Sequence, residues 1–144
     1  MSRLARLATD LAEPLLVSNP VNVRYLTGLD SSNAFLVVEP GGDTALYTDF
    51  RYLEAAREVA DVTLVETRRN VVGELAEHLA GRRIGVEVGH LTVARWETLR
   101  GGGVEVVGTA GVVERLRAVK DAGELNALRR AAALSDQVFE ELAR

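Results

Sequence analysis

Short apolar runs and segments with helical apolar spacing alternate along most of this sequence. Six runs are typical of buried strands, at 15–17, 34–39, 44–48, 62–66, 84–88 and 104–107. The segments with helical spacing or helix-start residues lie between and before them, at 4–11, 20–27, 50–59, 70–80 and 93–100. Because strands that alternate with helices bury their apolar faces by stacking in layers, we expect an α/β fold. The expected domain has three layers, with a mixed sheet of about six strands flanked by helices.

The mixed character of the expected sheet comes from one turn. Residues 40–43, Pro-Gly-Gly-Asp, separate two of the strand-like runs. A four-residue turn of this composition is typical of a β-hairpin, in which the two strands are antiparallel. The other connections pass through helices and favour parallel pairing.

The C-terminal stretch has a different pattern. Asp121 followed three residues later by Glu124 predicts a helix that starts with a capping box. Apolar or small residues then recur at alternating spacings of three and four, at Leu125, Leu128, Ala132, Ser135, Phe139 and Leu142. This single stripe predicts one helix of more than 20 residues. We therefore expect a domain over 1–120 and, over 121–144, a helix that serves as a connector or as half of an interface.

Composition and charge exclude several classes of protein. The 144 residues include no cysteine, which excludes disulfides and thiolate metal ligands. The net charge is −4 and the basic residues are scattered, which argues against nucleic-acid binding. No apolar run reaches the roughly 18 residues of a membrane span, and the N-terminus lacks the apolar region of a secretory signal. We expect no nucleic-acid partner, no membrane contact and a cytoplasmic location.

Four motifs occur in order along the chain. They are Asn-Pro-Val-Asn-Val-Arg-Tyr-Leu-Thr-Gly-Leu at 19–29, Leu-Tyr-Thr-Asp-Phe-Arg-Tyr at 46–52, Ile-Gly-Val-Glu at 84–87 and Leu-Arg-Ala-Val-Lys-Asp-Ala-Gly-Glu-Leu at 116–125. Together they resemble the shared segments of the N-terminal domains of creatinase, prolidase and aminopeptidase P. Leu29 departs from this pattern, since many relatives have an aromatic residue there. The resemblance implies the ribonuclease H-like fold of these domains and makes 121–144 a linker helix leading to a catalytic domain.

The resemblance also implies a function for a longer parent protein. Such a protein would be a metal-dependent hydrolase of Xaa-Pro bonds, an aminopeptidase or dipeptidase acting on short proline-containing peptides. Its two divalent ions, manganese, cobalt or zinc, would be held by two Asp, one His and two Glu of the catalytic domain. None of those ligand positions falls in this chain, so we expect no metal, cofactor or catalytic residue here.

Within such a parent, the N-terminal domain is expected to build a homodimer, to pack with its own catalytic domain and to gate substrate access. The alternative is a catalytically inactive peptide- or protein-binding module of the same architecture. A nucleotide-binding domain is disfavoured because no glycine-rich loop follows a strand.

The first motif has structural and catalytic interpretations. Asn19 is suited to cap the helix that Pro20 begins, and Gly28 is suited to end it. Asn22 and Tyr25 can tie the helix to the sheet through side-chain hydrogen bonds. Catalytic roles for the two asparagines are the competing interpretation, but capping accounts for the pattern without chemistry.

The second motif joins a strand to a helix. Asp49 is predicted to cap a helix starting at Phe50, and Arg51 is predicted to pair with Asp49 or with a neighbouring segment. Tyr52 completes this motif.

The polar loop Asp30, Ser31, Ser32 and Asn33 joins a glycine-ended helix to a core strand. Loops held on a rigid scaffold often carry binding residues, and an ordinary solvated connection is the competing interpretation. In several members of the resembled family, the loop at this place reaches the active site of the partner subunit, which makes it the candidate substrate-gating loop. His78 and His90 have no second ligand at a recognisable spacing, so we interpret both as surface histidines.

Overall fold

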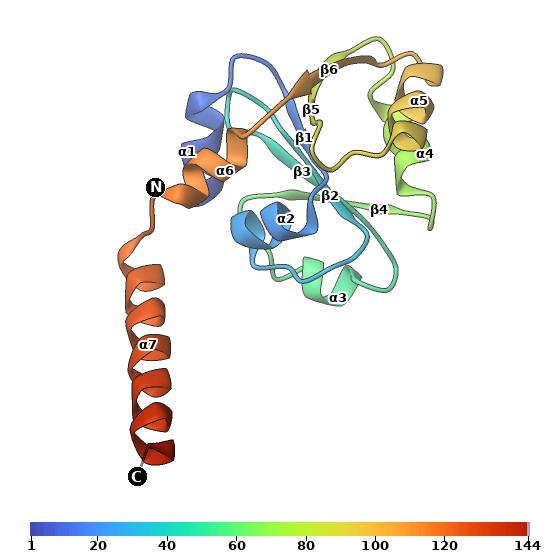
Figure 1. The fold of residues 1–144 in the computed structure, drawn as a ribbon. Helices are drawn as coiled ribbons and strands as arrows, with labels where there is room; N and C mark the ends of the chain where they lie inside the picture. Colours follow the sequence, from blue (N-terminus) through green and yellow to red (C-terminus); the bar gives the residue numbers. More distant parts are fainter. Residues whose placement is uncertain (144) are drawn as a thin grey trace. The chain divides into compact units, whose positions relative to one another are not determined.

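A computed structural model describes residues 1–143 and contains one sheet of six strands in the order β4-β3-β2-β1-β5-β6 (Figure 1). The strands are β1 Leu15–Val17, β2 Ala34–Val38, β3 Thr44–Asp49, β4 Thr63–Thr67, β5 Arg83–Glu87 and β6 Glu105–Thr109. The helices are α1 Arg3–Asp10, α2 Pro20–Thr27, α3 Leu53–Ala56, α4 Val71–His78, α5 Val93–Gly101, α6 Val112–Ala118 and α7 Ala122–Leu142. The predicted α/β fold with a mixed sheet is confirmed.

Strand directions define the edges of this sheet. β2 pairs antiparallel with both β1 and β3, whereas the pairs β1–β5, β5–β6 and β3–β4 are parallel. Five strands therefore run in one direction, and β2 alone is reversed. The predicted hairpin turn is closed by two backbone bonds, from Glu39 N–H to Asp43 O (2.8 Å) and from Gly42 N–H to Glu39 O (2.9 Å).

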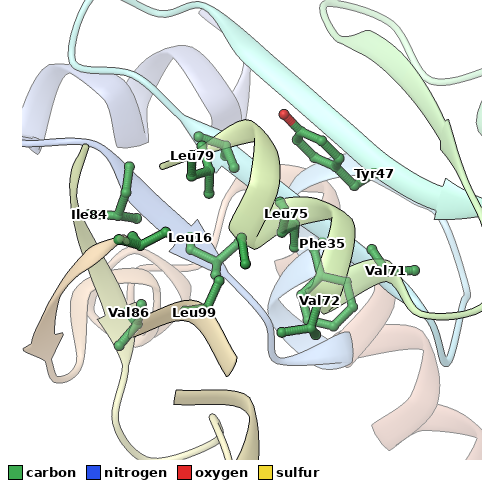
Figure 2. Packing of buried hydrophobic residues seen from close by; sticks show 13 residues of the cluster. Leu16, Phe35, Tyr47, Val71, Val72, Leu75, Leu79, Ile84, Val86 and Leu99 are labelled. Carbon is green, nitrogen blue, oxygen red and sulfur yellow. The ribbon is translucent and has the colours of Figure 1, made fainter. Parts of the chain in front are cut away.

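Helices cover both faces of the sheet because strand side chains alternate between faces. Leu16, Phe35 and Tyr47 belong to one buried cluster with side chains of α4 and α5 (Figure 2). The neighbouring positions in the strands, including Leu36 and Leu46, are equally buried. α1 and α2 pack against each other and against β2. The three-layer arrangement follows from these two apolar faces.

The residues at its two ends predicted the bounds of α2 correctly. Asn19 Oδ1 accepts a hydrogen bond from Val21 N–H (3.0 Å), and Pro20 is the first helical residue. Gly28 ends the helix with φ +78°, a left-handed conformation that glycine adopts without a side-chain clash.

The helix predicted over 50–59 is present only as the short α3, so its predicted start and length are wrong. Residues 50–52 form a turn, because Arg51 N–H bonds to the Asp49 side chain (3.0 Å) and Tyr52 N–H to Asp49 O (3.0 Å). α3 begins only at Leu53 and has no side-chain cap, so Asp49 is not a helix cap. The local hydrogen bonds of an aspartate competed with helix formation and prevailed.

The sequence interpretation missed α6, whose apolar positions Val112, Val113 and Leu116 have helical spacing but few repeats. The chain divides into two compact units, Met1–Val113 and Glu114–Arg144, and α6 spans the boundary.

α7 confirms the predicted capping box. Glu124 N–H bonds to Asp121 Oδ1 (2.8 Å), and Asp121 N–H bonds to Glu124 Oε2 (2.9 Å). α7 has 21 residues and no buried side chain. No helix in the described part of the chain is apolar enough over sufficient length to cross a membrane.

Candidate functional site at the carboxyl edge of the sheet

The carboxyl ends of the five co-directional strands meet at one edge of the sheet. These ends are Val17, Thr67, Asp49, Glu87 and Thr109, and β2 begins beside them at Ala34. Open α/β sheets characteristically bind ligands outside the carboxyl ends of their strands. Three of the four sequence motifs reach this edge, so it is the candidate site.

Glu87, at the end of β5, holds the start of α2. Its Oε2 accepts hydrogen bonds from Ser18 N–H (2.6 Å) and Asn19 N–H (2.7 Å). The Ser18 hydroxyl lies 3.3 Å from the same oxygen, and Asn22 Nδ2 donates to Oε1 at 2.6 Å. Glu87 and Asn22 are both buried, at 8% and 0% exposure. The carboxylate satisfies donors that the strand-to-helix turn would otherwise leave without partners.

This network gives both asparagines of the first motif structural roles. Asn19 caps α2 through its side chain, and Asn22 ties the helix to β5 as predicted. Tyr25 is held from α1: the Arg3 guanidinium lies 4.3 Å from the centre of its ring and donates to its carbonyl oxygen (2.9 Å).

Asp49, at the end of β3, is the second buried carboxylate of this edge. Its side chain has 0% exposure, and Arg51 binds it with Nε to Oδ1 (2.8 Å) and with a terminal nitrogen to Oδ2 (2.7 Å). Asn33 Nδ2 donates to Oδ2 at 2.5 Å. The hydrogen bonds from the Arg51 side chain hold the pKa of Asp49 far below its usual range. The predicted Asp49–Arg51 pair is confirmed.

Ser32 and Asn33, the second half of the candidate gating loop, are held by hydrogen bonds. Asn33 O accepts a bond from the Thr48 hydroxyl (3.0 Å), and the Ser32 hydroxyl lies 2.8 Å from the Tyr52 hydroxyl. Ser31 is buried, and its hydroxyl accepts from Asn33 N–H (3.1 Å). Asp30 is 81% exposed and forms an ion pair with Arg24 (3.4 Å). The loop thus presents Asp30 and Ser32 to solvent on a base anchored by Ser31 and Asn33.

α2 and this loop form one segment that joins the neighbouring strands β1 and β2. On the side away from β2, β1 pairs with β5, which supplies Glu87. On the side away from β1, β2 pairs with β3, which supplies Asp49. Two buried carboxylates therefore hold the segment from both sides. The sequence analysis placed Glu87 in a strand and assigned it no role. A carboxylate at the end of an apolar strand could have indicated a buried, hydrogen-bonded group.

Phe50 is a further exposed residue at this edge. It lies between the buried Asp49 and the turn residue Arg51, and it is 62% exposed. An aromatic side chain in water on an anchored turn is available for contact with another molecule.

The two buried carboxylates of this edge, Glu87 and Asp49, are engaged in hydrogen bonds that position α2 and the following loop. Among residues 1–143, no group of three His, Asp or Glu side chains could hold a metal ion. These residues therefore do not fit the dinuclear centre that the resemblance implies for a catalytic domain. His78 is exposed and packs against Tyr47, with ring centres 5.8 Å apart. His90 is half-buried, and its Nε2 is enclosed without a hydrogen-bond partner among the described residues.

The six-stranded mixed sheet and the ordered motifs along its carboxyl edge are those of a known class of N-terminal α/β domain. The sequence model of the Creatinase/Prolidase N-terminal domain matches residues 3–119, and the chain belongs to this family.

Relatives with known names agree with this assignment. The uncharacterized peptidase YqhT of Bacillus subtilis is 31% identical over 134 residues, which cover 89% of this chain and 38% of YqhT. The N-terminal domain of the cytoplasmic peptidase PepQ from Mycobacterium tuberculosis H37Rv is 31% identical with a TM-score of 0.70, covering 79% of this chain and 97% of that domain. An Xaa-Pro dipeptidase from Bacillus anthracis shares the fold, with a TM-score of 0.87 at 24% identity. That alignment covers 96% of this chain but 41% of the dipeptidase.

Proposed function

We propose that this chain is the non-catalytic N-terminal part of a metal-dependent Xaa-Pro peptidase, in which residues 1–120 form the domain and 121–144 lead to a catalytic domain. In that protein, the domain builds the dimer and limits access of peptides to the active site. Two divalent ions in the catalytic domain would activate water and polarise the scissile carbonyl. The family assignment over residues 3–119 is the observation that carries this proposal.

The anchored loop supports the gating role. Asn33 and Ser31 hold its base, while Asp30 and Ser32 face solvent. A loop that is rigid at its base can place exposed groups against a neighbouring active site with little entropic cost.

A two-part assay tests the peptidase assignment. The 144-residue chain should neither hydrolyse Xaa-Pro dipeptides nor bind Mn²⁺ or Co²⁺ stoichiometrically in calorimetry, whereas the full-length protein should do both. A full-length protein that folds but shows no turnover with either metal would contradict the proposal. Peptide binding without turnover would favour the alternative, an inactive binding module.

A loop variant of the full-length protein tests gating. Replacing Asp30 and Ser32 with glycine leaves the buried anchors intact and should change KM or the preference for peptide length. The matched control replaces Pro40 and Asp43 with glycine in the hairpin turn at the opposite edge. Equal kinetics of both variants on short and long peptides would rule out gating by this loop.

A further inference from the structure

A hollow with charged walls lies toward the edge of the sheet opposite the candidate functional site, where β2 ends and β3 and β4 begin. We call it the amino-edge hollow. It has a volume of about 780 Å³, and its lining comes from these three strands, the loops beside them and the residue before β5. All of the lining belongs to the unit Met1–Val113. Sites for small molecules typically have volumes of roughly 300–1,000 Å³, so the hollow is large enough for one.

The floor of the hollow is apolar and comes from one face of the sheet. Val37 of β2 pairs with Ala45 of β3. Tyr47 of β3 pairs with Val65 of β4. Because paired residues project from the same face, these side chains form one surface. Val37 and Tyr47 belong to the buried cluster under α4 and α5, and the other two pack against it. The hollow therefore exposes the margin of the main apolar cluster, where an apolar stem of a ligand could lie.

Tyr47 gives the hollow a polar group without a partner. The residue is only 7% exposed, and its hydroxyl makes no hydrogen bond within residues 1–143. Figure 2 shows this hydroxyl at the margin of the cluster, on the side away from Phe35 and Val72. Burial raises the pKa of the phenol, so it stays uncharged at neutral pH. Since buried hydroxyl groups normally have a partner, this one points to a ligand in the hollow that it lines.

The charged residues around the hollow carry an excess of negative charge. Arg82 Nη2 binds Glu39 Oε1 (2.6 Å), so the one guanidinium among the described lining residues is already neutralised. Asp43 and Asp61 also line the hollow, and neither carboxylate has an ion pair or hydrogen bond within residues 1–143. They lie at matching positions, each two residues before a paired residue of the neighbouring parallel strands β3 and β4. Two carboxylates of adjacent strand starts are thus left without a counter-charge.

We propose that the amino-edge hollow binds a small organic cation, in which an ammonium group is joined by an apolar stem to a second hydrogen-bonding group. The ammonium group faces Asp43 and Asp61, the stem lies on the apolar floor, and the far end bonds to the Tyr47 hydroxyl. Asp43 and Tyr47 are four residues apart on one strand, about 13 Å at about 3.3 Å per residue, and both side chains reach into the hollow. A stem of about five carbons fits this span.

An organic cation suits the hollow better than a metal ion. Among the described residues, no three His, Asp or Glu side chains are grouped so that they could hold a metal. The apolar floor also contributes to binding only if the ligand has an apolar part. The inference goes beyond the proposed peptidase function and does not depend on it, because its test measures only binding.

Titration with the linear aminopentanol that carries its ammonium and hydroxyl groups at opposite ends tests the site. We expect saturable one-to-one binding to the 144-residue chain in calorimetry, with amide chemical shifts that change at 43–47 and 61–65. The matched control is hydroxypentanoate, which has the same hydroxyl end but the opposite charge, and it should bind at least tenfold more weakly. Equal binding of the two compounds, or no saturable binding of aminopentanol, would overturn the proposal.

Charge-neutralising variants test the role of the two carboxylates. Asp43→Asn and Asp61→Asn should each weaken the binding of aminopentanol at least threefold. Asparagine tolerates the left-handed conformation of Asp61, whose φ is +61°, so the backbone is retained. Glu66→Gln removes the same charge on the opposite face of β4 and should change the dissociation constant less than twofold. Equal weakening by all three variants would reveal only a general effect of net charge and contradict the assigned site.

Tyr47→Phe separates a contact with the ligand from a merely structural role. This variant should weaken the binding of aminopentanol but not of pentylamine, which lacks the hydroxyl group. Tyr52→Phe removes a phenol hydroxyl at the other edge of the sheet and should leave both affinities unchanged. Equal weakening of both ligands by Tyr47→Phe would show that the hydroxyl does not contact the ligand, contrary to the proposal.

Two further measurements distinguish other occupants of the hollow. A full-length protein should bind aminopentanol as the 144-residue chain does. Loss of binding there would show that following sequence fills the hollow, and the proposal would be wrong. Nα-acetyllysine amide carries its ammonium stem on peptide groups and should bind more weakly than aminopentanol. Tighter binding of Nα-acetyllysine amide would assign the hollow to a lysine side chain of a peptide and overturn the assignment to a free small molecule.

Discussion

Glu87 and Asp49 hold the two ends of one segment by different chemistry. Glu87 binds uncharged donors at the start of α2, two of them backbone N–H groups. Asp49 binds the Arg51 guanidinium and the loop amide of Asn33. The partial positive charge of a helix N-terminus helps to stabilise the first carboxylate, and a full cation stabilises the second.

The two contacts also differ in their exposure to water. The donors bound to Glu87 include the buried Ser18 and Asn22, whereas the Arg51 side chain is 40% exposed. Loss of Glu87 would remove the hydrogen bonds that buried donors make to its carboxylate, whereas Arg51, once released, would be solvated by water. The comparison teaches that the start of α2 depends more strongly on its carboxylate than the loop does.

The largest effect is expected for Glu87→Ala. It removes the hydrogen bonds that Ser18, Asn19 and Asn22 donate to the carboxylate, and we expect a loss of roughly 3–5 kcal/mol in the free energy of unfolding. Urea unfolding followed by the fluorescence of Trp96, the single tryptophan, measures this loss. Glu66→Ala, at an exposed position of β4, is the control and should cost less than about 0.5 kcal/mol. A free-energy loss for Glu87→Ala no larger than that for Asp49→Asn would contradict the conclusion that the start of α2 depends more strongly on its carboxylate than the loop does.

Asp49→Asn should cost less, about 1–2 kcal/mol at pH 7, because half-exposed Arg51 can be solvated. Asp49 has a lowered pKa in the folded state, so the unfolded state binds the proton first as the pH falls. Its stabilisation is present above about pH 4, the ordinary range of aspartate, and is lost progressively below it. The difference between wild type and Asp49→Asn should therefore shrink from pH 5 to pH 2. Asp43→Asn, an exposed turn residue, is the control, and a constant difference across this range would contradict the assignment.

Gly28→Ala tests the left-handed turn that ends α2, between the contacts with Glu87 and those with Asp49. Its φ of +78° strains any residue with a Cβ, although no atom lies within 4 Å of the position a Cβ would take. We expect a cost of about 1 kcal/mol from the backbone alone. Gly41→Ala also meets open space but has no positive φ, so it should be neutral or stabilising. Equal effects at both glycines in thermal unfolding would show that the left-handed turn is not required.

The smallest effect is expected for Tyr52→Phe, which should leave the unfolding midpoint unchanged. The hydrogen bond from Ser32 lowers the pKa of the Tyr52 phenol, whereas burial raises that of Tyr47. In an alkaline titration at the tyrosinate absorbance, Tyr52→Phe should remove a phenol whose pKa is lowered. Ser32→Ala should move the same transition to higher pH. A titration curve unaltered by both variants would show that the loop is not tied to Tyr52.

The elements that the sequence predicted well are those whose interactions lie within a few residues. Asn19, Pro20 and Gly28 define both ends of α2, and the capping box of Asp121 and Glu124 defines the start of α7. The hairpin at 40–43 likewise follows from its turn residues. Side chains bond to the backbone of near neighbours in these cases, so their geometry is nearly independent of the rest of the chain.

Asp49 shows the limit of such local reasoning. A helix cap and a turn both suited an aspartate at this position. Arg51, two residues on, binds the Asp49 carboxylate locally and favours the turn, and Asn33, 16 residues away, adds a contact that local reasoning does not include. The predicted helix at Phe50 failed for this reason.

The sequence by itself determined the layered α/β architecture, the ends of α2 and the stripe on α7. Only the tertiary structure decided that Glu87 binds Asn22, 65 positions away, and that Asp49 binds Asn33. The physical reason is that these contacts depend on strand order: β5 must lie beside β1 and β3 beside β2 before either carboxylate reaches its partner. That order is set by packing of whole apolar faces, which no short segment encodes.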